Sequence, residues 1–143
     1  MMDLVERALK VTDDAWGKVG FDSRALPPTL QVVHLIDQLE FEVTLGGVLG
    51  WLTNSSGKYG PDTVKALEAI GAPKCAAIVR EVLAFFPEGT PAFEDQERVR
   101  QILAVEDVAE SHWSDLGDRL LAWPEDIYVL LEKFIAEHEA DFT

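Results

Sequence analysis

Acidic side chains are the residues in this sequence that are numerous enough to form a functional surface. The chain has 26 Asp and Glu residues against 12 Lys and Arg, and a formal charge of −14. General acid–base catalysis needs a carboxyl group in a pocket that shifts its pKa. The carboxylates between positions 106 and 141 fall mostly opposite the apolar faces of expected helices, where solvated charge is usual. We therefore interpret them as a surface and not as catalytic pairs.

The other side chains that could do chemistry are isolated from one another. His34, His112 and His138 lie in three different expected elements, and none has a second His or a Cys at metal-ligand spacing. The serines of residues 54–57 are followed by glycine, but they lack the strand–turn–helix context of a nucleophilic serine. No P-loop with its lysine accompanies the glycines. The sequence predicts neither an enzyme nor a metal or cofactor site.

A regular row of carboxylates is the sharpest functional pattern. Glu125, Glu132 and Glu139 are seven residues apart, so on a straight helix they would form one exposed row at roughly 10.5 Å spacing. Rigid rows of negative charge can imitate a phosphate backbone, although this spacing alone does not identify DNA as the molecule copied. The candidate partner-binding residues are Asp115, Asp118, Glu125, Asp126, Glu132, Glu137 and Glu139.

The charge is concentrated toward the end of the chain. Residues 94–143 hold 14 acidic and 4 basic residues, whereas residues 1–93 hold 12 acidic and 8 basic residues. Nucleic acid is a poor direct partner for such a surface, because phosphate binding depends on Lys and Arg. We expect a basic protein as the partner, such as a transcription factor or a toxin.

Glycines and turn residues divide the middle of the chain. Adjacent glycines within residues 44–60 interrupt an apolar-periodic segment, and a short Asn-Ser-Ser-Gly run then offers caps and a turn. A further glycine is placed to end the next helix. The structural motif comprises Gly46, Gly47, Trp51, Asn54, Ser55, Gly57 and Gly71.

The pattern of apolar residues predicts an all-α fold of about six to eight helices in one compact domain of 143 residues. We expect an N-terminal helix and connection over residues 1–28, and a helical core over residues 29–143. Expected helices cover residues 3–16, 29–43, 48–53, 61–70, 73–86, 95–103, 109–123 and 125–142, with a less certain pattern from Val105 and a glycine interruption at Gly117.

The same composition predicts a cytoplasmic protein. No segment reaches the roughly 18 uncharged apolar residues that a membrane span needs, and the N-terminus lacks the pattern of a signal peptide. The single Cys75 has no partner for a disulfide within the chain, which is typical of a reducing compartment.

The glycine motif also carries a resemblance to a known family. That family consists of small bacterial all-helical proteins and is named after the C-terminal domain of a DNA-mimic protein. The resemblance covers roughly residues 30–142 and implies an all-helical fold. Because the founding protein occupies the DNA-binding surface of a transcription factor, it also implies a non-enzymatic interaction protein. The residues that carry it are Glu42, Gly46, Gly47, Trp51, residues 54–57, residues 66–72 and the ending from Ile127 to Phe142.

Two other classes of function stay open at this point. Small acidic helical proteins are often immunity or antitoxin-like proteins that cover the basic site of a toxin. The chain could instead have only a structural role. A homodimer is compatible with each of these interpretations.

Overall fold

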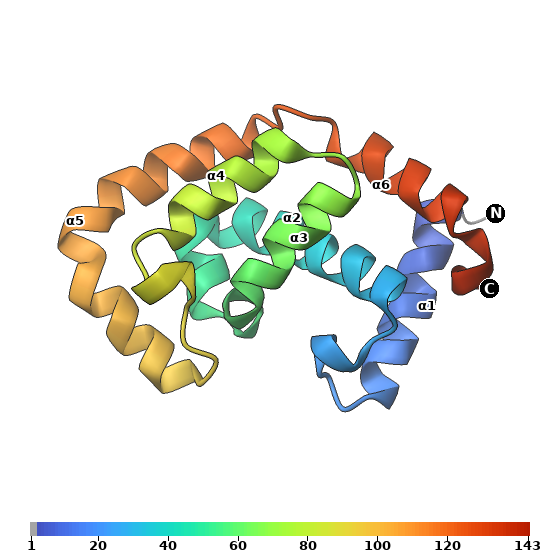
Figure 1. The fold of residues 1–143 in the computed structure, drawn as a ribbon, viewed down its shortest axis with the longest axis horizontal. Helices are drawn as coiled ribbons and strands as arrows, with labels where there is room; N and C mark the ends of the chain where they lie inside the picture. The colour runs from blue at the N-terminus through green and yellow to red at the C-terminus, as the bar shows by residue number, and fades with distance from the viewer. Residues whose placement is uncertain (1–2) are drawn as a thin grey trace.

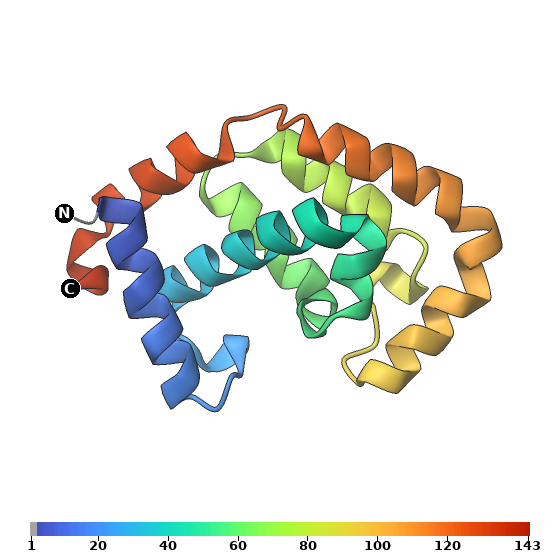
Figure 2. The same ribbon diagram turned by 180° about the vertical axis from the view of Figure 1, so that it is seen from behind.

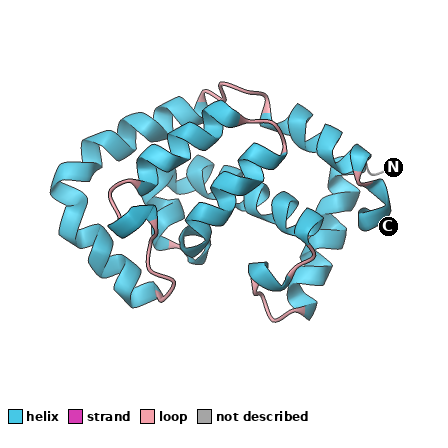
Figure 3. Ribbon diagram, in the orientation of Figure 1, coloured by secondary structure: helices cyan, strands magenta, loops and turns pink. Residues whose placement is uncertain are grey.

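The computed structural model describes residues 3–143, without the side chain of Ser55. Its described part is helical throughout and has no strand (Figure 1, Figure 3). Six α-helices and four short 3-10 helices agree with the predicted all-α fold. In chain order they are α1 (Leu4–Lys18), η1 (Ser23–Ala25), α2 (Pro28–Thr53), η2 (Ser55–Tyr59), α3 (Gly60–Ala69), α4 (Pro73–Leu83), η3 (Pro87–Gly89), α5 (Asp95–Leu121), α6 (Ile127–Glu137) and η4 (Glu139–Phe142).

Helix α2 is bent where the sequence places two glycines. Gly47 has φ 68° and ψ −172° inside the helix, a conformation that a residue with a Cβ rarely adopts. Gly46 has no positive φ, and a Cβ there would meet open space. The predicted break at the glycines and the short helix over residues 48–53 are confirmed, because α2 consists of two helical segments joined by a kink at Gly47. The segment after the kink buries Trp51 and Leu52.

Helices α3 and α4 form a hairpin around Gly71. This glycine has φ 86°, and its amide donates to the carbonyl of Glu68 at 3.0 Å, closing the end of α3. Ala72 is fully buried and precedes Pro73 at the first position of α4. The predicted helix–glycine–helix arrangement is confirmed.

Helix α5 is a single helix of 27 residues. The prediction of two shorter helices, with a break after Leu103, is wrong. Gly117 does not interrupt the helix, because it is a packing position: a Cβ there would lie 3.3 Å from a methyl group of Val48. The low helix propensity of glycine is offset by close contact between α5 and α2.

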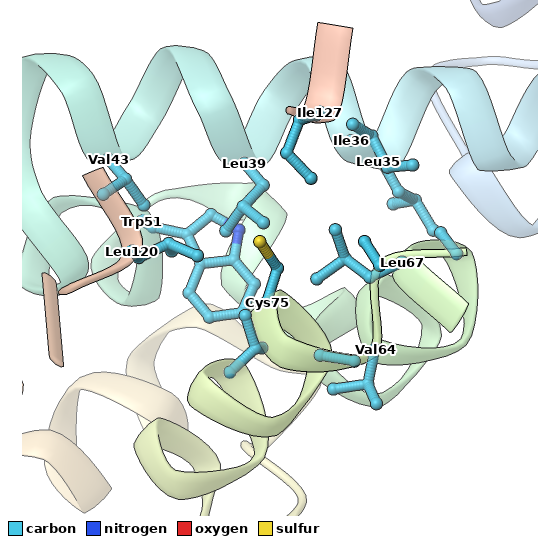
Figure 4. Packing of buried hydrophobic residues seen from close by; sticks show 14 of the residues in the cluster. Leu35, Ile36, Leu39, Val43, Trp51, Val64, Leu67, Cys75, Leu120 and Ile127 are labelled. Atoms are coloured by element: carbon cyan, nitrogen blue, oxygen red, sulfur yellow. The ribbon is translucent and has the colours of Figure 1, made fainter. Parts of the chain in front are cut away.

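The core is one cluster of buried side chains that runs from α1 to the C-terminus. Figure 4 shows its centre, where Leu39 and Trp51 of α2 lie together with Cys75 of α4 and Leu120 of α5. Val5 of α1 belongs to the same cluster, so the N-terminal helix shares the core of the rest. Around this core, α5 and α6 follow one another as an outer arc, seen from both sides in Figures 1 and 2.

Candidate functional site

The outer arc carries most of the carboxylates that the sequence singles out. We call this surface the acidic arc. All of its side chains are exposed, and they lie on α5, α6 and η4. By the rise of an α-helix, the 27 residues of α5 follow a path of about 40 Å, and the helix bends along this path (Figure 1). The acidic arc comprises Asp107, Glu110, Asp115, Asp118, Glu132, Glu137 and Glu139.

The α5 part of the acidic arc owes its direction to burial of the opposite face. Trp113 and Leu120 are buried, and the indole Nε1 of Trp113 donates to the carbonyl of Val82 at 3.1 Å. Asp107 and Asp118 are eleven residues apart, close to three helical turns, so they share the outward face. The helix therefore presents these two carboxylates to solvent from a fixed backbone.

The predicted row of Glu125, Glu132 and Glu139 is wrong. Helix α6 begins only at Ile127 and ends at Glu137, so of the three only Glu132 lies on it. Glu125 precedes the helix and Glu139 follows it in η4. The spacing of about 10.5 Å, which assumed one straight helix, does not apply.

Glu125 instead caps the start of another helix. Its Oε2 accepts from the amide of Lys74 at 2.7 Å, and its Oε1 accepts from the amide of Cys75 at 2.8 Å. Partial burial acts to raise the pKa of Glu125, but the hydrogen bonds from these two amides outweigh it and hold the pKa below its ordinary value of 4.5. This carboxylate holds the loop before α6 against α4.

Asp126 has a similar structural task at its own helix. Its Oδ1 accepts from the amide of Val129 at 3.2 Å, which is the usual role of an N-cap aspartate. Glu125 and Asp126 were both predicted to bind a partner. The structure places both in the framework that positions α6, and only Asp126 is fully exposed.

Arg98 is the residue whose importance the sequence did not reveal. Its side chain has no exposed surface, and its guanidinium donates to the carbonyls of Leu52 at 2.8 Å and Asn54 at 3.1 Å. It also donates to the carbonyl of Ala92 at 3.0 Å and pairs with Asp95 at 2.8 Å. Arg98 thereby joins the end of α2 to the start of α5. Its only signal in the sequence was a basic residue at an apolar-face position.

The glycine motif contacts this arginine through Asn54. Asn54 donates a side-chain hydrogen bond to Glu42 while its carbonyl accepts from Arg98. A Cβ at Gly57 would come within 2.8 Å of the carbonyl carbon of Leu52, so the chain can pass there only as glycine. The side chain of Ser55 lies outside the described part. Residues 54–57 of the motif form a structural turn, and one carbonyl of this turn accepts from a buried guanidinium.

The histidines and the cysteine lie apart from one another. His34 is buried against Trp16, with ring centroids 4.7 Å apart, and burial lowers its pKa to about 4. Burial, aided by Glu125, raises the pKa of the Cys75 thiol to about 12. Within residues 3–143, no group of three or more His, Cys, Asp and Glu side chains could hold a metal ion. No helix in that range is long and apolar enough to cross a membrane.

Comparison with known proteins places the chain in a family. Residues 24–138, more than half of the chain, match the family model described as DMP19-like protein. That description does not mention a C-terminal domain, so this part of the expected resemblance stays a prediction. No curated protein and no solved structure matches the chain. The matched range begins within η1 and extends through α6, so it includes the glycine motif and all of the acidic arc except Glu139, and the chain belongs to the DMP19-like family.

Proposed function

We propose that this protein is a non-enzymatic interaction module of the DNA-mimic type, which binds the basic surface of a DNA-binding protein through the acidic arc. The observation that supports this proposal is the alignment of exposed carboxylates along α5 and α6. Membership of the DMP19-like family is compatible with it.

The charge balance of α5 favours a basic partner. Of the three arginines on this helix, Arg98 is buried, Arg100 pairs with Glu97 at 2.9 Å, and Arg119 reaches Glu81 at 3.3 Å. These contacts leave the outward carboxylates to dominate the field. Such a field accelerates association with a positively charged protein, and added salt weakens it.

Rigidity is the second requirement for copying a charged backbone. The carboxylates of α5 stand on one continuous helix whose other face is part of the core. The cap that Glu125 provides fixes the loop between α5 and α6. A partner would therefore meet charges that are already in place, so less conformational entropy is lost on binding. The cytoplasmic location and the homodimer stay predictions.

The decisive variant reverses charge on the acidic arc without touching a cap. Asp107→Lys with Asp118→Lys changes the formal charge by four on the outward face of α5. The matched control is Asp14→Lys with Glu88→Lys, which makes the same change at exposed positions on α1 and η3. Glu125 and Asp126 are left intact, because their loss would disturb the framework itself.

The assay is affinity capture from a lysate of the source organism, with and without excess duplex DNA, followed by mass spectrometry. The wild-type protein and the control should retain a DNA-binding protein that duplex DNA displaces, and the acidic-arc variant should lose it. Retention by the acidic-arc variant would contradict the assignment of the surface. Capture of a toxin that DNA does not displace would contradict mimicry and favour the immunity-protein alternative.

A further inference from the structure

A pocket of about 510 Å³ opens to solvent between α1, α2 and α6. It is lined by these helices and by the loop before α6, and the helices meet at one end of the fold in Figure 1. Its volume is within the range of pockets that hold small molecules. The lining consists of apolar Val5, Leu9, Ile36, Ile127 and Leu131, acidic Asp37, Glu40 and Asp126, and aromatic Trp123 and Tyr128.

The apolar part of this pocket comes from three helices that pack together. Val5, Ile36 and Leu131 are buried members of the core cluster, one from each of α1, α2 and α6. The hydroxyl of Tyr128 donates to Asp3 at 3.2 Å and so ties α6 to the start of α1. The pocket is therefore bounded by elements that already hold one another in place.

The acidic part lacks a neutralising partner within the described residues. No ion pair there includes Asp37, Glu40 or Asp126, and no Lys or Arg lines the pocket. Burial raises the pKa of Asp37 to about 6, and the nearby carboxylates of Asp13 and Glu40 add to this effect. Asp37 is thus held half-buried beside apolar surface, with Glu40 and Asp126 exposed at the rim of the pocket, an arrangement that a bound cation would stabilise.

We propose that this pocket binds a small amphipathic amine, whose ammonium group is held by Asp37 and Glu40 while its apolar body packs on Leu9, Ile36 and Leu131. A bare metal ion does not match the lining, because no group of three or more His, Cys, Asp and Glu side chains within residues 3–143 is placed to hold one. An anion would meet only carboxylates. The inference is independent of the proposed function, because it involves neither the acidic arc nor a protein partner.

The test compares three ligands of one shape by isothermal titration calorimetry at pH 7.5 and physiological salt. The probes are 4-phenylbutylamine, its neutral analogue 4-phenylbutan-1-ol and the anion 4-phenylbutyrate. The amine should bind at least about tenfold more tightly than the alcohol, which corresponds to one charge-assisted contact, and the anion should not bind. Equal affinity for amine and alcohol would overturn the proposal. Spermidine, which is cationic but has no aromatic group, should bind more weakly than 4-phenylbutylamine. Stronger binding of spermidine would indicate general attraction between opposite charges and would contradict the proposal.

Variants then locate the amine in the pocket. Asp37→Asn with Glu40→Gln should lower amine affinity about tenfold or more, because both neutralise the same end of the pocket. The matched control, Asp107→Asn with Glu110→Gln, removes two charges from the α5 part of the acidic arc and should leave affinity unchanged. Melting curves verify that each variant is folded. An equal loss in both pairs would contradict the site.

A second variant and the pH dependence give independent readouts. Leu9→Trp should fill the pocket and block amine and alcohol alike without altering charge. Affinity for the amine should fall as the pH drops through about 6, because Asp37, whose pKa is about 6, then takes up a proton. The other titratable groups near this carboxylate or lining the pocket are Asp13, Glu40, Asp126 and Tyr128. Unchanged affinity in the filled variant, or from pH 7.5 to pH 5, would overturn the assignment. Loss of partner capture by acidic-arc variants would leave both results unaffected.

Discussion

Replacing Glu125 by alanine tests whether this carboxylate is a structural cap or part of a binding surface. Helix α4 begins after Ala72, whose methyl side chain cannot accept a hydrogen bond from the first amides of the helix. Pro73 occupies the first helical position. The amides of Lys74 and Cys75 depend on the carboxylate of Glu125, 50 residues or more away in sequence. Glu125→Ala leaves both amides without this partner and removes a negative charge from the positive end of the helix dipole.

The expected loss follows from these two contributions. Loss of a helix cap costs about 1 kcal/mol, and loss of a favourable charge at a helix terminus costs about 0.5 kcal/mol more. Because two amides are bonded and one is part-buried, we expect a total of about 2 kcal/mol, or a melting temperature lower by about 6 °C for a chain of this size. Glu125→Gln keeps one acceptor oxygen, so it should lose about half as much. Thermal melting followed by circular dichroism measures both.

The control and the pH dependence make the result specific. Glu132→Ala removes an exposed carboxylate from α6 and should change stability by less than about 0.5 kcal/mol. The pKa of Glu125 in the folded state is below its ordinary value of 4.5. The stabilisation by its ionised carboxylate is therefore complete above pH 4.5 and is lost as the pH falls through the folded-state pKa. A melting temperature for Glu125→Ala equal to that of Glu132→Ala at pH 7 would refute the capping role.

Three further changes probe the framework and the pocket. Arg98→Met should destabilise the fold by about 3–5 kcal/mol in urea denaturation, because four carbonyls lose their hydrogen-bond donor: those of Leu52, Asn54, Ala92 and Phe93. A loss of stability below about 1 kcal/mol would contradict this role. Gly57→Ala should destabilise the fold far more than Gly71→Ala, because a Cβ at Gly57 overlaps the backbone of Leu52. Gly71→Ala should cost about 1 kcal/mol, since Gly71 has a positive φ but a Cβ there would meet open space. Equal losses of stability would contradict the close approach of Gly57 to Leu52. Asp37→Asn should stabilise the protein by about 1 kcal/mol at pH 7 after allowance for solvent screening, because the folded-state pKa of about 6 exceeds the ordinary 3.8 and ionisation of Asp37 therefore opposes folding. This gain in stability should vanish below pH 4. A loss of stability at pH 7 would contradict the expected direction of the effect.

The helices could be predicted from sequence wherever local patterns decide them. Gly71, with Pro73 two residues later, was sufficient to place the α3–α4 hairpin, because positive φ and a fixed proline φ act within a few residues. The length of α5 was underestimated, because the helical pattern weakens from Val105 and two helices, residues 95–103 and 109–123, were expected in its place. Gly117 has low helix propensity, and its compensating contact with Val48 of α2 is 69 residues distant in sequence.

The roles of charged residues were harder to predict. The outward direction of Asp118 follows from helical periodicity and needed no structure. Asp107 lies between the two expected helices, so its place on the same face follows only from the continuous α5. The assignments of Glu125 and Arg98 depend on which amides and carbonyls tertiary packing brings near them. Charge in the sequence identifies a residue that needs a partner, but the partner of Glu125 is another helix and that of Arg98 is the end of α2.

The contacts of Arg98 also determine which parts of the chain can open together. Helix ends ordinarily fray, and the first turns of α5 are largely exposed apart from Arg98 and Ile102. Separation of these turns from the body would withdraw the guanidinium from Leu52 and Asn54 in the same event. The start of α5 and the end of α2 therefore form one cooperative unit. Amide hydrogens at this helix end should exchange at the slow rate of the α2 terminus rather than at the fast rate of a free end.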